Sequence, residues 1–186
     1  MKAEHKFSPN ENELIIGLIT SGEFKTRGLD IALTVLAEIK KKYSFKFLVT
    51  GRDKNAQAYK DLSEELGLKE NVIFLETTPD VEKYYHALDI FFLPARFETF
   101  GRSILEAMAC GLPVLTSNQT GASEILQSKQ LIKSPDDTAG WVSALEELFT
   151  NEDWRRRIAK QNAERALLLD ENHYGQMLTK ILGLGE

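Results

Sequence analysis

The run Leu14-Ile-Ile-Gly-Leu-Ile-Thr20 is apolar at almost every position and follows the polar, turn-like stretch Ser8-Pro-Asn-Glu-Asn-Glu13. A strand with one face in water alternates apolar and polar residues, whereas a short unbroken apolar run is typical of a strand buried on both faces. Such strands occur in parallel sheets, because helices cover both faces of those sheets. The run therefore predicts a central strand of a parallel sheet.

Outward from this strand, strand-like and helix-like segments alternate along the chain. Leu29 to Lys42 carries apolar residues at helical spacing, and Phe45-Lys-Phe-Leu-Val-Thr50 is the next strand-like run. The remaining predictions are strands at 72–75, 90–93, 113–116 and 131–132, and helices at 55–66, 81–88, 103–109 and from 135 onward. Parallel strands require crossover connections, which helices supply with right-handed topology. The pattern predicts an α/β fold with an open, doubly wound parallel sheet.

The composition narrows the class of protein. The 186 residues are 42% hydrophobic and 27% charged, which is ordinary for one globular domain and disfavours disorder. The formal net charge of −5 argues against nucleic-acid binding. A single cysteine, Cys110, excludes an internal disulfide and a multi-cysteine zinc site, and it fits a reducing, cytoplasmic setting. We expect neither a membrane span nor a signal peptide, because no long apolar run occurs.

Basic residues follow three of the predicted strands. Lys25 and Arg27 come after the first strand, Arg52 after the second, and Arg96 and Arg102 after the fourth. The carboxyl ends of parallel strands share one edge of the sheet, and ligands bind at that edge. These residues predict an anionic ligand there. The alternative, that polar side chains simply gather in loops, stays open from the positions alone.

The common phosphate-binding motifs are missing from the sequence. It has no G-x-G-x-x-G after the first strand, no G-x-x-x-x-G-K-[ST] and no D-x-D pair for a metal-bound diphosphate. No G-x-S-x-G occurs, which disfavours a serine hydrolase. The three histidines, His5, His86 and His173, are isolated from one another and predict surface or packing roles. An anion site must therefore be built in another way.

The segment from Leu93 to Leu115 offers such a site. A predicted strand ends at Leu93, and Phe100-Gly101 leads into a predicted helix. The first N–H groups of a helix have no intrahelical partner, and together with the helix dipole they favour a phosphate. Glycine allows the backbone to come close to such a ligand.

Two glutamates flank this turn at a spacing of eight residues, Glu98 and Glu106. Carboxylates repel a diphosphate, but they accept hydrogen bonds from sugar or ribose hydroxyls that lie beyond it. The alternative for Glu106 is a capping box with Ser103, in which its side chain reaches back to the helix start. Both interpretations stay open on the residues alone.

The same residues resemble a known family. Glu98-Thr-Phe-Gly-Arg-Ser-Ile-Leu-Glu106-Ala-Met-Ala-Cys-Gly-Leu-Pro113-Val resembles the E-x7-E phrase of the retaining family 4 glycosyltransferases, which have the GT-B fold. Asp89-Ile-Phe-Phe-Leu-Pro94 and Gly121-Ala-Ser-Glu124 are similar to its flanking motifs. Gly22-Glu-Phe-Lys-Thr-Arg-Gly-Leu-Asp30 resembles its first phosphate loop, in the form closest to lipopolysaccharide-core glucosyltransferases. The resemblance implies a Rossmann-like, doubly wound parallel sheet with helices on both faces, the C-terminal half of a GT-B fold.

The resemblance also implies roles, position by position. The implied catalytic residues are Arg27 and Lys25, which would meet the diphosphate, and Glu98, which would meet hydroxyls of the donor sugar. The implied donor-binding residues are Gly22, Arg52, Thr78, Thr99, Phe100, Gly101, Arg102, Ser103 and Glu106. Arg27 stands where the family usually has lysine, and Gly22 stands where it has arginine. We expect no cofactor and no essential metal, since the nucleotide sugar is a co-substrate.

The resemblance divides the chain into residues 1–13 as an interdomain linker, 14–170 as the nucleotide-sugar donor domain, and 171–186 as a C-terminal helix that packs on an N-terminal acceptor domain. The implied reaction moves a hexose from a nucleotide diphosphate sugar, with UDP expected, to a glycan or lipopolysaccharide-type acceptor. The expected location is cytoplasmic, and peripheral contact of the full enzyme with the inner face of the membrane is left open. Two alternatives remain: a non-catalytic nucleotide-binding or interaction module, and a UDP-sugar epimerase of the same fold.

Overall fold

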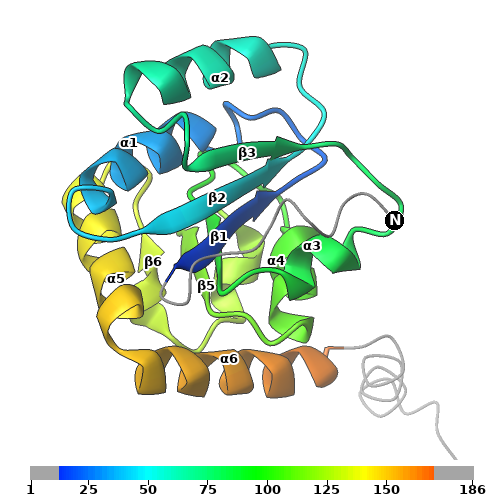
Figure 1. The fold of residues 1–186 in the computed structure, drawn as a ribbon. Coiled ribbons are helices and arrows are strands. Elements are labelled where there is room, and N and C mark those ends of the chain that lie inside the picture. The colour runs from blue at the N-terminus through cyan, green and yellow to red at the C-terminus, as the bar shows by residue number, and fades with distance from the viewer. Residues whose placement is uncertain (1–12, 170–186) are drawn as a thin grey trace, which may run out of the picture.

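A computed structural model describes residues 13–169 of the chain (Figure 1). Its sheet is parallel throughout and has the strand order β3-β2-β1-β4-β5-β6. The strands are β1 (Leu14–Ile19), β2 (Phe45–Thr50), β3 (Val72–Leu75), β4 (Ile90–Leu93), β5 (Val114–Ser117) and β6 (Ile132–Lys133). The expected C-terminal helix at 171–186 and nearly all of the expected linker at 1–13 lie outside the described residues.

Helices connect the strands and cover both faces of the sheet. They are α1 (Leu29–Ile39), α2 (Ala56–Glu65), α3 (Glu82–His86), α4 (Arg102–Ala109), α5 (Thr138–Thr150) and α6 (Glu152–Leu167), with two short 3-10 helices, η1 (Gly121–Glu124) and η2 (Lys129–Leu131). α1 packs against α2 and α5, and α4 packs against α6. Figure 1 shows these two groups on opposite sides of the sheet. The predicted doubly wound parallel sheet is confirmed.

The central strand β1 is buried as its unbroken apolar run predicts. Ile16 and Leu18 have no exposed surface. Gly17 lies between them, and a Cβ atom there would overlap the side chain of Leu88. The missing side chain therefore lets Leu88, which directly precedes the Asp89–Ile90 entry into β4, pack against β1. Asp89 fixes the same junction, because its carboxylate accepts a hydrogen bond of 2.8 Å from the Ile15 N–H.

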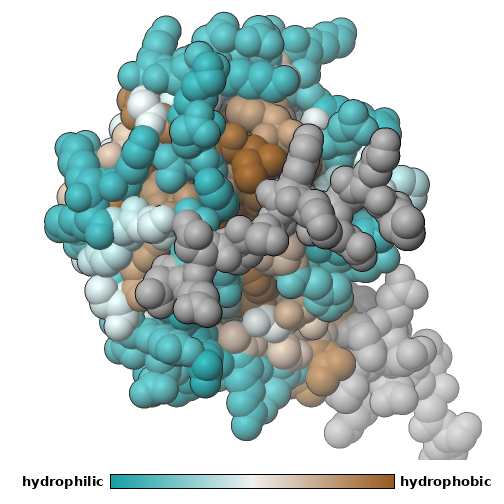
Figure 2. Space-filling view, in the orientation of Figure 1, coloured by the Kyte–Doolittle hydropathy of each residue, from teal (hydrophilic) through white to brown (hydrophobic). Residues whose placement is uncertain are grey.

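The face of the molecule drawn in Figure 2 is mainly hydrophilic. Figure 2 shows hydrophobic atoms gathered where the edge strand β3 lies, among hydrophilic side chains of the surrounding helices. Ile73, Phe74 and Leu75 of β3 are half-buried, which fits an edge position. Within residues 13–169, no helix is long and apolar enough to cross a membrane.

Candidate functional site

The strand order places a crevice at the carboxyl ends of β1 and β4. These neighbouring strands send the chain to opposite faces of the sheet, and ligands of doubly wound sheets bind where the winding reverses. A cavity of about 780 Å³ lies there, lined by segments that follow β1, β2, β3 and β4. Its volume is in the range of small-molecule sites, which is roughly 300–1,000 Å³.

The cavity brings together most of the residues singled out in the sequence. The predicted residues that line it are Arg27, Arg52, Thr78, Glu98, Thr99, Phe100, Gly101, Arg102, Ser103 and Glu106. Gly22 and Lys25 do not line it. The polar lining residues that the sequence did not single out are Thr20, Ser21, Thr50, Thr77 and Tyr85.

Arg27 is the best-fixed cation of the cavity. One terminal nitrogen, Nη2, lies 2.7 Å from Oε2 of Glu98, and the other, Nη1, donates a hydrogen bond of 2.6 Å to the Phe97 carbonyl. Its Nε atom is buried and has no hydrogen-bond partner among residues 13–169. Only 17% of the Arg27 side chain and 14% of the Glu98 side chain are exposed, so the pair is held away from bulk water. Partners within the protein thus hold Nη1 and Nη2 of the guanidinium, and the Nε–H donor is unused within the described residues.

Gly22 acts through the space that it leaves empty. A Cβ atom at this position would lie 2.9 Å from both Nε and Nη2 of Arg27, closer than unstrained contact allows. Gly22 is therefore a seat for the Arg27 guanidinium rather than a lining residue. In this chain the guanidinium at 27 occupies the space that a side chain at 22 would need.

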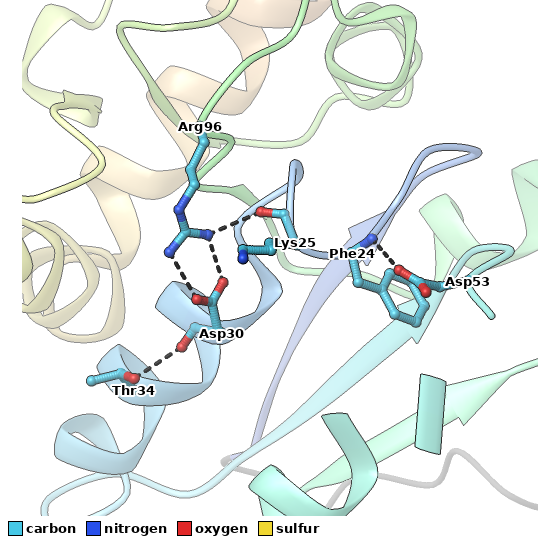
Figure 3. Close-up of polar contacts among 6 residues, drawn as sticks. All are labelled: Phe24, Lys25, Asp30, Thr34, Asp53 and Arg96. Carbon is cyan, nitrogen blue, oxygen red and sulfur yellow. Dashed lines mark hydrogen bonds and ion pairs between the residues drawn. The ribbon is translucent and has the colours of Figure 1, made fainter. Parts of the chain in front are cut away.

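The loop that carries Arg27 is anchored on both sides, as Figure 3 shows. On one side, the Asp53 carboxylate accepts a hydrogen bond of 2.6 Å from the Phe24 N–H. On the other, Arg96 donates to both carboxylate oxygens of Asp30, at 2.7 and 2.8 Å, and to the Lys25 carbonyl at 2.9 Å. Arg96 is therefore engaged outside the cavity. Lys25 contributes its main chain to this anchor while its side chain is exposed.

The amino end of α4 forms another wall of the cavity. Gly101 begins the helix with a left-handed backbone (φ 96°), and no side chain caps the first N–H groups. Those N–H groups are available to a ligand, and the helix dipole favours an anion there. The capping box proposed for Ser103 and Glu106 is not formed. Oε2 of Glu106 instead accepts a hydrogen bond of 2.7 Å from the Tyr85 hydroxyl.

Comparison with known proteins agrees with this geometry. Residues 1–165 match the sequence profile of the family described as glycosyl transferases group 1. The chain belongs to this family. An uncharacterized glycosyltransferase of Haemophilus influenzae is 25% identical over 174 residues, which are 91% of this chain and 48% of that protein. The chain therefore spans about half the length of this relative.

Solved glycosyltransferase structures share the fold. The crystal structure of WaaG, a glycosyltransferase involved in lipopolysaccharide biosynthesis, superposes with a TM-score of 0.76 at 25% identity, over 84% of this chain and 43% of that one. Anabaena HepE in complex with UDP-glucose gives 0.78 at 23% identity, over 94% of this chain and 50% of that one. The Rossmann-like fold predicted for the C-terminal half of a GT-B glycosyltransferase is confirmed.

Tyr85 is the lining residue of this glycosyltransferase domain that sequence reasoning most clearly missed. Its ring is buried and packs on Phe91 with ring centroids 5.9 Å apart. Burial, reinforced by the hydrogen bond to Glu106, raises the pKa of the Tyr85 phenol far above its ordinary value. A tyrosine in a short predicted helix, with no other site motif around it, is expected to pack in the core. The only available signal was that a buried phenol requires a hydrogen-bond partner.

Proposed function

We propose that this chain is the donor-binding half of a retaining glycosyltransferase that takes a hexose from a UDP-sugar and transfers it to a glycan or lipopolysaccharide-type acceptor. One observation carries the proposal: a single cavity is lined by Arg27, the uncapped amino end of α4 and the carboxylate of Glu106. Positive and hydroxyl-accepting groups thus stand side by side, which is the complement of a diphosphate joined to a ribose.

The parts of the donor divide over this cavity. We assign the diphosphate to Arg27 and the α4 amides, the ribose to Glu106, and the base to the segment after β3, where Thr77 and Thr78 line the cavity. Hydroxyls of the transferred sugar fall to Glu98. The UDP-glucose complex of HepE supports the choice of UDP, and the likeness to WaaG supports a lipopolysaccharide-type acceptor.

The proposed reaction breaks the bond between the anomeric carbon of the sugar and the oxygen of the diphosphate. The diphosphate leaves with the electron pair, an acceptor oxygen bonds to the anomeric carbon from the same face, and the acceptor proton passes to the leaving diphosphate oxygen. Negative charge grows on the leaving oxygen, and prearranged donors stabilise it most in the transition state. Arg27 suits this task because its planar fork meets phosphate oxygens with two donors. We propose that the chain's own donors stabilise this negative charge without a resident metal.

We further propose that an acceptor-binding domain completes the active cleft, because the chain spans about half of its Haemophilus influenzae relative. The same length relation favours a second function for the chain in isolation, a nucleotide-binding module without transfer activity. The two proposals differ in one observable result. A module binds UDP and releases no sugar from a UDP-sugar unless the acceptor domain is added.

Calorimetry with UDP, GDP and ADP tests the donor assignment. We expect UDP to bind with micromolar to millimolar affinity and more tightly than GDP or ADP. A preference for another nucleotide would overturn the choice of base. No heat with any of the three would refute a nucleotide-sugar site.

A further inference from the structure

Tyr85 makes a contact for which the proposed reaction has no need. Its hydroxyl lies 2.7 Å from Oε2 of Glu106, a residue 21 positions further along the chain. We propose that Tyr85 is a positioning residue: it fixes the carboxylate of Glu106 for a vicinal diol and thereby makes the site selective for ribonucleotides. This inference rests on the proposed function, which places the ribose at Glu106.

The two partners differ greatly in mobility. Tyr85 is 1% exposed, and its ring is clamped by packing on Phe91 of β4. Glu106 lies on the exposed side of α4, where a glutamate side chain has several rotamers of similar energy. The rigid tyrosine therefore selects the rotamer of the flexible glutamate. Among residues 13–169, Tyr85 is the hydrogen-bond partner of the Glu106 carboxylate.

The hydrogen bond has a fixed direction. Because burial and the nearby Glu106 carboxylate raise its pKa, the Tyr85 phenol keeps its proton at neutral pH and always donates. An ionised carboxylate only accepts hydrogen bonds, with two lone pairs on each oxygen. Tyr85 uses one lone pair of Oε2. The other lone pair of Oε2 and both lone pairs of Oε1 remain, and neighbouring hydroxyls of a ribose can use one on each oxygen.

The consequence is a difference between ligands rather than a uniform change in affinity. A ligand with ribose hydroxyls gains from a carboxylate that is already oriented, because less rotamer freedom is lost on binding. A ligand that lacks both hydroxyls gains nothing from this orientation. Removing the phenolic hydroxyl should therefore reduce the ratio of the two affinities. A change in the general shape of the cavity would lower both affinities together.

The experiment compares UDP with 2′,3′-dideoxy-UDP by calorimetry on the full chain and on Tyr85→Phe. The substitution keeps the ring and its packing on Phe91. We expect about a five- to tenfold loss of UDP affinity and less than about a twofold loss for the dideoxy compound, since ribose binding must then immobilise the Glu106 side chain itself. Equal losses for both ligands, or no loss for either, would overturn the positioning role.

Tyr84→Phe is the matched control. Tyr84 lies beside Tyr85 on α3, but its hydroxyl donates to the Glu76 carbonyl at 2.9 Å. This variant should leave the UDP to dideoxy-UDP ratio unchanged, and a ratio that falls as far as in Tyr85→Phe would contradict the inference. Failure of the proposed function has a separate signature, because the unchanged protein would then bind UDP no better than the dideoxy compound. Melting curves verify that all variants are folded.

Discussion

Gly22→Ala tests whether the Arg27 guanidinium keeps its position because residue 22 has no side chain. The new Cβ atom would lie 2.9 Å from Nε and Nη2 of Arg27, whereas ordinary contact begins near 3.4 Å. The guanidinium must therefore retreat by about half an ångström. That movement stretches the 2.7 Å ion pair with Glu98 and the 2.6 Å hydrogen bond to the Phe97 carbonyl.

The expected cost falls on binding rather than on folding. A hydrogen bond to a charged group contributes roughly 1.5–3 kcal/mol, and losing about half of one between the displaced guanidinium and the diphosphate corresponds to about 1 kcal/mol, or roughly fivefold in Kd for UDP. The guanidinium is the far end of a flexible side chain, so the fold accommodates its shift. Gly22 does not have a left-handed backbone, and alanine there restricts the unfolded chain. The melting temperature should stay the same or rise slightly.

Calorimetry with UDP on four proteins isolates the effect: the unchanged chain, Gly22→Ala, Arg27→Ala and the double variant. With Arg27 removed, the new methyl group meets no guanidinium, and Gly22→Ala should then cost less than about twofold. The two substitutions are thus expected to couple by about 1 kcal/mol. The same fivefold loss in both backgrounds, or full affinity in Gly22→Ala, would refute the idea that Gly22 seats Arg27.

Three further predictions follow from the site. Glu106→Ala should weaken UDP binding about tenfold by calorimetry. The free energy of unfolding should change by less than about 1 kcal/mol, because Glu106 does not cap α4. A stability loss without an affinity loss would contradict this prediction. Arg96→Ala should speed amide hydrogen exchange at residues 24–28 and leave exchange at residues 45–50 unchanged. It should cost little stability, since the ion pair between Arg96 and Asp30 is partly exposed. Unchanged exchange at 24–28 would contradict the role of Arg96 as an anchor of this loop. The phenol of Tyr85 has its pKa raised by burial, by Glu106 and weakly by Cys110, so its contribution to stability is complete below about pH 10 and declines above it. Urea midpoints of the unchanged chain should therefore fall more between pH 9 and pH 11 than those of Tyr85→Phe; parallel curves would contradict the shift.

The fold was predictable where burial alone determines the local pattern. β1 is buried on both faces, so its unbroken apolar run identified it without reference to any partner. β6 has only two residues, and its position depends on pairing of Ile132 with Thr116 and of Lys133 with Ser117. A pairing between distant segments leaves no periodic signal in either one. The first helix ends at Ile39, before the lysines that the predicted range had included.

The sequence predicted which loops form the site, but not which of their side chains face the cavity. The rule that ligands bind at the carboxyl ends of the strands correctly predicted that Arg27, Arg52 and Arg102 lie at one cavity. Arg96 is as cationic in sequence as these three, yet Asp30 binds it outside the cavity. Which arginine faces the ligand depends on where its carboxylate partner lies in space. Residue type and loop position contain no information on that choice.

Arg27 and Arg96 connect the loop after β1 to the loop after β4. Arg27 extends from the loop after β1 and donates to the carbonyl of Phe97, in the loop after β4. Arg96 extends in the opposite direction and donates to the carbonyl of Lys25, while its own N–H bonds the Thr26 carbonyl at 2.9 Å. Each guanidinium is thereby located by the main chain of the other loop, so neither loop can move without displacing both charges.

These contacts between the two loops explain how a chain with a net negative charge holds one guanidinium in a fixed position at the cavity. The Arg96 charge is neutralised by Asp30 with two short hydrogen bonds, which leaves it few donors for a competing anion. Arg27 is neutralised by Glu98 at one nitrogen only and keeps its buried Nε without a partner in the described part of the chain. Of these two arginines, Arg27 is the one that lines the cavity, beside the uncapped amino end of α4, so its guanidinium is the one placed to meet an anion there. The two arginines therefore differ in position: Asp30 holds Arg96 outside the cavity, whereas Arg27 lines it.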